Sequence, residues 1–436
     1  MLDIQPFITA YDPTDLPGGS IDPLGFDRGY EWLAEKILPG LTNVASRPRY
    51  LSVYCAALVI AEDDVDLSGL ERERRQQKRE MMMQLERLWT LSCVLGGEAE
   101  PSIPESGIRG LRYVQAHVRK MRAGSDGSFK LLLQQARYGM LGIYGSLADK
   151  LKLVANADLQ LTEPGRKLGE AFLQETRLPP AIRGAVWKPR TIDRDTLADW
   201  GRRAHVNGAL GEKEAALLVE LVEQDPTRER MCAHLQANPL HDGETELHRL
   251  ERVAVVLNAS TDQGLAEAVR AILAYENAYR SIVLTFQRVL LQCQSEPFRF
   301  DLAKASSDAV IPAMFANASA IHAQLDRAFS DASTAAFAQG SERAADVRGF
   351  VGDVAAAKTP SDFVATILER HRRVLNARVA GGRSKMPWLE VVDGVVKPTL
   401  AIAQQVRDNL DTPEAILAHP FRTFAADRFY GSGVAS

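Results

Sequence analysis

The chain has few of the features that mark secreted, zinc-stabilised or membrane-embedded proteins. It contains four cysteines in 436 residues, and none forms a C-x-x-C pair, so neither a disulfide framework nor a zinc ribbon is indicated. No window reaches the roughly 18 uninterrupted apolar residues of a membrane span, and the first residues lack the basic and apolar stretches of a secretion signal. We therefore expect a cytoplasmic protein without a membrane partner.

Recognisable catalytic motifs are also missing. There is no G-x-S-x-G elbow, no H-E-x-x-H helix and no Rossmann glycine fingerprint, and the GGRSK stretch at 381–385 lacks phosphate-loop spacing. Four side chains could supply zinc ligands, namely Cys232, His234, His241 and His248. The Asn238-Pro239 step interrupts the helix that would bring them to one face. We expect no catalytic residue, no metal and no cofactor, and a nuclease with scattered acidic ligands is kept as an alternative.

Charge is unevenly distributed along a chain of ordinary globular composition. With 46% hydrophobic and 25% charged residues, the chain can bury several cores, enough for roughly two or three domains. The formal net charge is only −4, yet residues 109–190 hold 15 Lys and Arg against 6 Asp and Glu, so the rest of the chain carries −13. Such a local excess is typical of a surface that contacts a phosphate backbone.

The clearest local pattern is LKLVANADLQLTEPGRKLGEAF at 151–172. Residues 151–155 and 159–161 alternate at period two around an Asn-Ala-Asp turn, which predicts a two-stranded hairpin. A helix is expected to follow at once, because Thr162 is a suitable N-cap and Pro164 suits the first turn. Its core face would hold residues at i, i+3 and i+4 spacing, namely Leu168, Ala171 and Phe172.

This segment resembles the L-x-L-T-x-x-G-x-x-L segment of winged-helix proteins, most of which bind DNA. The resemblance implies a winged-helix domain over about 108–175, with the hairpin as its wing. Three predicted helices precede the wing in the order that the fold requires: 108–122, 129–138 and 139–150. The last of them carries only Lys150 as a base near its end, whereas a recognition helix places several polar or basic side chains toward the major groove. We therefore expect contacts to phosphates rather than to bases.

The predicted architecture is a mainly α, multi-domain helical protein with a central winged-helix-like domain that contributes a small β wing. An N-terminal helical domain would span 1–104, the winged-helix-like domain 105–190 and a C-terminal helical domain 191–436. An apolar run at 50–61 without strict alternation indicates a buried helix, and a charged helix is expected at 70–95. The C-terminal part is rich in helix formers, so it is predicted to be almost wholly helical.

The candidate DNA contacts are cations of the central segment, on the helix at 108–122, on the wing and on the helix after it. They are Arg109, Arg112, Arg119, Lys120, Arg122, Lys150, Lys152, Arg166 and Lys167. A second basic cluster lies close to Trp388, on which one base could stack. It supplies Arg372, Arg373, Arg383 and Lys385. Each set is also compatible with an ordinary solvated surface.

The N-terminal segment 22–58 carries two short steps, Pro39-Gly40-Leu41-Thr42 and Arg47-Pro48-Arg49-Tyr50. The first step ends a helix, and the second places two arginines around a proline-fixed extended stretch before the buried helix, as in a fixed joint between domains. The segment resembles the N-terminal part of large bacterial proteins encoded among phage-defence genes, with their PG-[LI]-T and R-x-R-Y steps. That resemblance implies a role in antiphage defence and brings no assigned chemistry.

We expect a non-catalytic DNA-binding component of a multi-protein bacterial system, with double-stranded DNA and other protein subunits as partners. The alternative is a helical scaffold whose winged helix binds a protein. The two differ in their surface charge. Contiguous unpaired cations around Lys120 and Lys167 favour DNA, whereas cations neutralised by Glu163 and Glu170 favour a protein partner.

Overall fold

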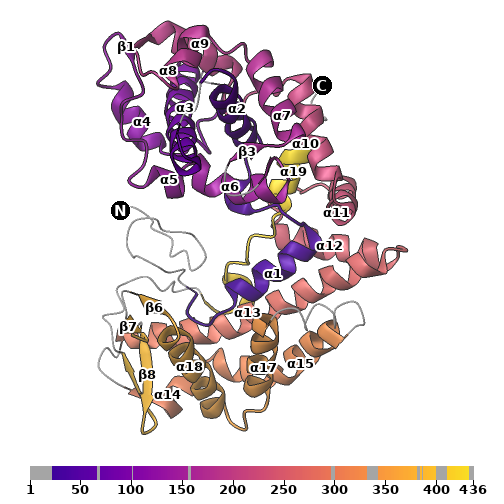
Figure 1. Cartoon of the computed structure of the whole chain (residues 1–436). Coiled ribbons are helices and arrows are strands. Elements are labelled where there is room, and N and C mark those ends of the chain that lie inside the picture. The colour runs from indigo at the N-terminus through magenta and orange to yellow at the C-terminus, as the bar shows by residue number, and fades with distance from the viewer. Residues whose placement is uncertain are drawn as a thin grey trace. The chain divides into compact units, whose positions relative to one another are not determined.

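The structure is a computed structural model that describes residues 22–65, 69–100, 102–155, 159–295, 300–330, 342–380, 383–384, 386–398 and 410–431. Within these residues the protein is mainly helical with a few short antiparallel strands, which confirms the predicted α character (Figure 1). No helix in these segments is both long enough and apolar enough to span a bilayer. The chain divides into two compact units. Unit 1 comprises Met1–Ile37 and Asn238–Phe421, and unit 2 comprises Leu38–Ala237 and Arg422–Ser436.

Unit 2 contains most of the patterns described above. Its helices are η1 (Asn43–Ala45), α2 (Arg49–Asp63), α3 (Glu71–Ala99), α4 (Leu111–Val118), α5 (Gln135–Tyr138), α6 (Met140–Lys150), α7 (Glu163–Glu175), α8 (Pro180–Ala185), α9 (Arg194–Arg203), α10 (Glu212–Glu223), α11 (Pro226–Ala237) and α19 (Thr423–Gly431). Its strands are β1 (Gly124–Ser125), β2 (Val154–Ala155), β3 (Gln160–Leu161) and β4 (Ile192–Asp193). β1 pairs with β4 and β2 pairs with β3, both antiparallel.

The core of unit 2 forms around α2 and α3. Every residue of α2 from 49 to 61 is buried, as expected of an apolar run without alternation. α3 is largely exposed in its first turns and mostly buried from Met81 onward. α7 packs on α2, and α9 packs on α3. The backbones of α3 and α9 lie in direct contact. A Cβ on Gly201 of α9 would overlap the carbonyl oxygen of Ser92 of α3, so only glycine fits at this position.

The R-x-R-Y step joins distant parts of unit 2. Arg49 is buried and uses all five of its N–H donors. Two donors reach the Glu214 carboxylate at 3.3 and 2.9 Å. The others reach three backbone carbonyls, those of Arg203, His205 and Ala209. Pro48 is helical, with φ −55° and ψ −40°, so the extended stretch predicted there is wrong and α2 begins directly after it.

The hairpin and helix expected in the central segment are present. β2 and β3 pair with Val154 opposite Leu161, and the turn residues 156–158 lie outside the described part. α7 begins after Thr162, whose Oγ1 accepts a hydrogen bond from the Gly165 N–H at 3.3 Å. The residues expected on its core face are buried, namely Leu168, Ala171 and Phe172.

The helices before the hairpin differ from the prediction. α4 is shorter than the expected 108–122, and residues 129–134 are not helical, so α5 is a single turn. The ring of Phe129 stacks on His117 of α4, which turns this stretch back along α4 instead of into a helix. β1 pairs with β4 rather than with the hairpin. A winged-helix domain as a whole therefore stays a prediction.

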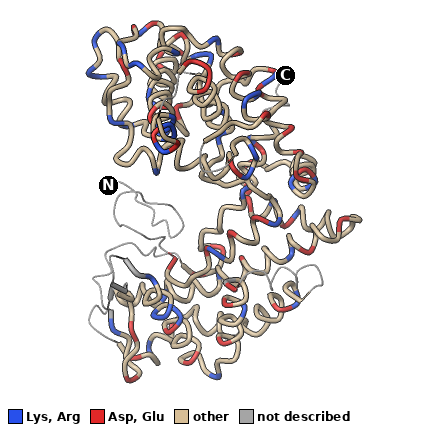
Figure 2. Tube along the Cα trace, in the orientation of Figure 1, with Lys and Arg blue, Asp and Glu red and all other residues tan. Residues whose placement is uncertain are grey.

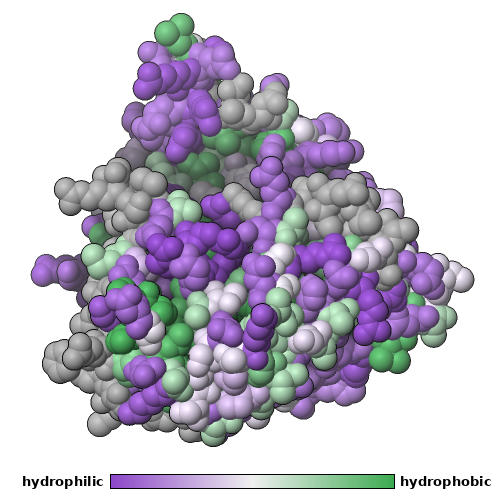
Figure 3. Space-filling view, turned by 90° about the horizontal axis from the view of Figure 1, so that it is seen from below, coloured by the Kyte–Doolittle hydropathy of each residue, from purple (hydrophilic) through white to green (hydrophobic). Residues whose placement is uncertain are grey.

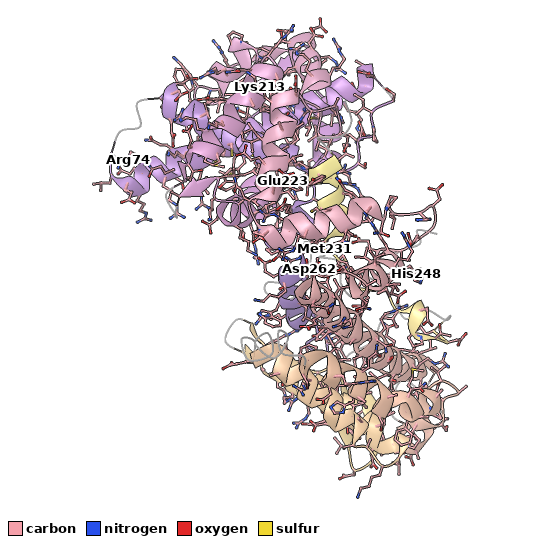
Figure 4. All side chains as sticks on the ribbon, turned by 90° about the vertical axis from the view of Figure 1, so that its right-hand side faces the viewer. Arg74, Lys213, Glu223, Met231, His248 and Asp262 are labelled. Carbon is pink, nitrogen blue, oxygen red and sulfur yellow. The ribbon has the colours of Figure 1, made fainter. Side chains whose placement is uncertain are left out.

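The expected domain boundaries at 104 and 190 both fall inside unit 2. The pairing of β1 with β4 and the packing of α3 on α9 bring parts of all three expected domains together. The chain also returns to unit 2 at its end, where α19 packs on α10 and α11. Figure 4 shows Glu223 at the end of α10 beside α19, whose Tyr430 hydroxyl donates to it at 3.3 Å. That residues 1–104, 105–190 and 191–436 fold as three independent domains stays a prediction.

Unit 1 is built around one long helix, α13 (Gln263–Ser295), against which α1, α12 and α15 pack. Its other helices are α1 (Asp27–Ile37), α12 (Glu246–Asn258), α14 (Leu302–Ser306), α15 (Ile311–Ser330), α17 (Glu342–Ala355), α18 (Pro360–Asn376) and η2 (Pro413–Ala415). Its strands are β5 (Phe300–Asp301), β6 (Val379–Ala380), β7 (Arg383–Ser384), β8 (Leu389–Val392) and β9 (Val395–Pro398). On the face seen in Figure 3, apolar patches are separated by hydrophilic residues.

A small sheet, in the order β5-β9-β8, corrects the expectation of an almost wholly helical C-terminal part. β8 and β9 form a hairpin with Val391 opposite Val396. Its turn is Asp393-Gly394, where both residues have positive φ, 53° and 75°. An Asp-Gly pair between apolar strands is a strong hairpin signal, because both positions of a type I′ turn need left-handed backbone.

The C-terminal segment of unit 1 is anchored by a buried histidine. His419 Nδ1 lies 2.7 Å from Glu276, and its Nε2 lies 3.5 Å from Asp27. The imidazole stacks on Tyr30 with ring centroids 4.3 Å apart. Burial alone would lower the pKa of His419, but the two carboxylates outweigh it and raise the pKa to about 9. His419 is therefore charged at neutral pH.

Candidate nucleic-acid interface

Helix α4 presents a basic side to solvent because its apolar residues fall on the opposite side. Val114 and Val118, four residues apart, are buried. The helix starts after Gly110, whose φ of 70° is left-handed. A Cβ at Gly110 would also collide with the carbonyl oxygen of Leu131, so glycine allows the following segment to lie against the start of α4.

The turn after β1 is held against α4. The Ser125 hydroxyl lies 3.0 Å from His117 Nε2, and the His117 ring stacks on Phe129 with centroids 4.4 Å apart. Burial lowers the pKa of His117, which keeps this ring neutral at pH 7. A backbone carbonyl of the turn accepts a hydrogen bond from Arg87 Nε at 2.9 Å. These contacts fix the position of the backbone at Lys130, which follows Phe129.

Five exposed cations define what we call the α4 surface: Arg112, Arg119, Lys120, Arg122 and Lys130. Within the described part of the chain, none of the five forms an ion pair or a side-chain hydrogen bond. Residues 107–137 contain 7 Lys and Arg but one acid, Asp126. The Ser128 N–H donates to Asp126 at 2.8 Å and lowers its pKa. Figure 2 shows basic positions along α4 and the turn after it.

The spacing of these cations suits a polyanion. Arg112 and Arg119 are seven residues apart, which places them on one side of the helix with about 10 Å between their backbones. A guanidinium group can donate two parallel hydrogen bonds to the oxygens of one phosphate, and the ammonium group of Lys120 adds a mobile point charge. Because the cations have no counter-charge of their own, an anionic ligand would relieve their mutual repulsion.

Arg109, by contrast, belongs to the packing of unit 2. Its guanidinium donates to the backbone carbonyls of Tyr138 and Val44. It also lies over the rings of Tyr50 and Tyr144, at 5.9 and 5.6 Å from their centroids. These contacts occupy the side chain, so we do not include Arg109 in the α4 surface.

A buried carboxylate beside Arg109 has the perturbed pKa that often marks a catalytic acid. Glu86 is fully buried, and burial raises its pKa to about 7 despite hydrogen bonds and nearby arginines that lower it. Its two oxygens accept from the Met140 N–H at 2.6 Å and from Gln135 Nε2 at 2.7 Å. The carboxylate therefore caps the start of α6, which is a structural role.

The cations that follow the hairpin are paired with acids. Arg166 donates to Glu62 at 2.8 Å and lies 3.7 Å from Glu170. Lys167 lies 3.3 Å from Glu163. At this position the structure has the neutralised arrangement expected of a protein-binding winged helix, whereas around Lys120 the cations are unpaired.

Glu62 also lines a pocket of about 490 Å³ beside the first turns of α3. Arg74, another lining residue, is labelled on this part of α3 in Figure 4. Lys78 also lines this pocket, and it donates to Glu62 at 2.9 Å and to the Leu159 carbonyl at 3.0 Å. The lining residues are Glu62, Val65, Glu71, Arg74, Arg75, Lys78 and Gln160. Three cations face two carboxylates there, so the pocket is a weaker anion site than the α4 surface.

Lys150 and Lys152 are exposed at the end of α6. Lys152 has a left-handed φ of 55°, and its carbonyl accepts a hydrogen bond from Thr162 Oγ1 at 2.6 Å. This bond ties the backbone of Lys152 to the start of α7 and leaves the ammonium group in solvent. Both lysines stay predicted DNA contacts.

The second basic cluster lies in unit 1 and is mostly engaged there. Arg372 and Arg373 each have an acidic partner, at 2.6 and 3.7 Å. His371 next to them is buried, and this burial lowers its pKa to about 4. Its Nε2 accepts a hydrogen bond from the backbone N–H of Trp388 at 2.8 Å. The side chain of Arg383 and the whole of Lys385 lie outside the described part of the chain.

Metal-ligating side chains do not gather in the described segments: no three His, Cys, Asp or Glu residues there lie close enough to hold an ion. Cys232, one of the weighed zinc ligands, is buried in α11 and is not in a disulfide. The other three cysteines are also buried and outside any disulfide, namely Cys55, Cys93 and Cys293.

Two residues near the α4 surface are not among the predicted contacts. Lys130 belongs to the local charge excess of residues 109–190, and its place on the α4 surface becomes visible only in the structure. Trp187, whose residue surface is 47% exposed, follows α8 and precedes Lys188. The available signal was the WKPR run at 187–190, an aromatic residue among bases.

Comparisons with protein-family models, curated proteins and solved structures found no match to this chain.

Proposed function

We propose that unit 2 binds double-stranded DNA through its phosphates, using the α4 surface, as a non-catalytic part of a larger assembly. The observation that carries this proposal is the set of five exposed cations without acidic partners in the described part of the chain. Cations on ordinary protein surfaces are interspersed with acids, and the paired Arg166 and Lys167 of the same unit illustrate that arrangement. We leave those two outside the proposed contacts.

Binding of this kind is expected to depend steeply on salt. Each phosphate neutralised on duplex DNA adds about −0.9 to the slope of log affinity against log salt, so five contacts give about −4.5. Between about 50 and 200 mM salt, affinity should then fall roughly 500-fold. Sequence selectivity should be weak, because phosphate contacts position a protein without reading bases.

The test is fluorescence anisotropy of a labelled duplex across that salt range, with R119E/K120E/R122E as the variant. Losing three contacts should weaken binding and bring the slope to about −2. The matched control is R202E/K213E/R230E, which makes the same charge change on α9, α10 and α11. An unchanged slope in the first variant, or an equal loss in the control, would contradict the proposal.

The hairpin β2–β3 followed by α7 supports reading the region around α4 as winged-helix-like. In this proposal the α4 surface, rather than the wing, supplies the phosphate contacts. The cytoplasmic setting, the partner subunits and the antiphage role implied by segment 22–58 belong to the same proposal. Co-purification of the full chain with proteins encoded beside it would test the assembly.

A protein-binding scaffold is the second candidate. It is favoured by the ion pairs of Arg166 and Lys167, which cover the positive charge after the hairpin. This candidate predicts no duplex binding even at about 50 mM salt, where phosphate contacts are strong. The nuclease alternative is checked by incubating plasmid with the protein and Mg²⁺, since cleavage would require an acidic site that the α4 surface does not contain.

A further inference from the structure

We propose, building on the DNA-binding role above, that Trp187 stacks on an unpaired base. The preferred ligand would then be a duplex that continues into a single strand, with the duplex on the α4 surface and the first unpaired base against the indole. An uninterrupted duplex would use the α4 surface alone.

The exposure of Trp187 sets it apart from the two buried tryptophans of unit 2. Trp89 and Trp200 are 0% exposed, and their Nε1 atoms donate to the Ala204 carbonyl at 2.7 Å and to Thr176 Oγ1 at 3.3 Å. Trp187 is 47% exposed, and its indole N–H has no partner among the residues that the structure describes. Tryptophan is enriched at binding interfaces, because its ring buries a large area and its N–H can still reach a polar partner.

The end of α8, two residues before Trp187, lies beside the turn at 125–128, which precedes Lys130 of the α4 surface. One side-chain amide, that of Gln84, is 2.6 Å from the Asp126 carbonyl and 3.5 Å from the Ala185 carbonyl. The two carbonyls are therefore neighbours, and Ala185 is two residues before Trp187. Pairing of β1 with β4 then brings Ser125 opposite Ile192, so the chain from α8 to β4 follows the turn.

The loop that presents Trp187 is fixed rather than loose. Arg190 donates to the carbonyls of Pro180 and Ala181 at 3.1 and 3.3 Å, which ties the end of the loop back to α8. Val186, next to the tryptophan, is buried. A ring held in place loses little conformational freedom on binding, which favours affinity.

An unpaired base is the part of DNA that this arrangement can recognise. Inside a duplex both faces of each base are covered by its neighbours, whereas an unpaired base offers a free face to an aromatic ring. Lys188 is exposed and without an ion pair in the described part, so it can hold the phosphate next to that base. One stacked base should raise affinity by about 5- to 150-fold.

The test compares two ligands on the full chain: a blunt labelled duplex and the same duplex with a short single-stranded tail. The readout is the ratio of their dissociation constants at one salt concentration. We expect tailed DNA to bind about 5- to 150-fold more tightly than blunt DNA. W187A should bring the ratio close to one, W187F should retain part of it, and L133A, which truncates another exposed apolar side chain, should leave it unchanged.

The outcomes separate this inference from the proposed function. A ratio near one in the unchanged protein, or a full ratio in W187A, overturns the stacking role while duplex binding by the α4 surface can still stand. No binding of either ligand overturns both. Quenching of tryptophan fluorescence by the tailed ligand, absent in W187F, would support the direct contact.

Discussion

Breaking the buried ion pair between Arg49 and Glu214 should cost unit 2 a large part of its stability. The two side chains are 2% and 0% exposed. Glu214→Gln keeps the size of the side chain and removes its charge. The guanidinium would then keep its three backbone carbonyl partners but lose its counter-charge inside the core.

The expected magnitude follows from this burial. Removing one partner of a buried pair costs about 3–5 kcal/mol, because the remaining charge is left uncompensated in apolar surroundings. Whole domains are stable by only about 5–15 kcal/mol. A loss of about 4 kcal/mol shifts the folding equilibrium by nearly a thousandfold. R49M/E214M removes both charges, but it also removes the donor from three backbone carbonyls at about 1–3 kcal/mol each, so it is not expected to recover the loss.

Hydrogen exchange of peptides from α9 and α10 is a suitable assay, since it reports on unit 2 without assuming that the whole chain unfolds in one step. Urea unfolding followed by tryptophan fluorescence gives the free energy. The matched control is R202Q, which breaks the exposed Arg202–Asp199 pair and should cost under about 1 kcal/mol. A cost for E214Q no larger than that of R202Q would refute the reasoning.

Three further changes are predicted. The pKa of His419 rises from 6.5 to about 9 on folding, so its contribution to unit 1 is complete below pH 6.5 and lost as the pH approaches 9; H419F should flatten urea midpoints over this window. The pKa of Glu86 rises from 4.5 to about 7, so unit 2 should lose stability as the pH rises between these values, and E86Q should remove that dependence in hydrogen exchange. G201A should destabilise unit 2 by about 1–3 kcal/mol through its clash with α3, whereas G145A, with only an ordinary contact at 3.8 Å, should stabilise it by about 0.5–1 kcal/mol in urea unfolding.

The elements predicted well are those whose signal is local. The apolar run of α2 and the core face of α7 follow from residue spacing alone, and both are buried. The helix predicted over 129–134 is not formed. The contact of Phe129 with His117, which belongs to a different element, decides the conformation of this stretch. The β8–β9 hairpin is absent from the sequence prediction although Asp393-Gly394 is a local signal for it, since the helix-forming composition of the C-terminal part as a whole outweighs one pair of residues.

The candidate site divides in the same way. The excess of cations in the central segment is visible in sequence, and it identified four of the five members of the α4 surface. Which cations are neutralised is not visible, because their partners are distant: Arg166 and Glu62 are 104 residues apart. Such pairs form only when folding has placed α2 against α7, so composition could not separate the paired cations from the unpaired ones.

The position of α19 in the chain has a consequence for biosynthesis. Unit 2 starts at residue 38, yet its last helix emerges from the ribosome after the 238–421 segment of unit 1. Chains are synthesised at about 5–20 residues per second, so the surface of α10 and α11 that α19 covers would stay uncovered for roughly 10–40 s before α19 is made. A nascent chain is thus exposed at this surface during most of the synthesis of unit 1, and a premature stop before residue 422 would release unit 2 in that incomplete form.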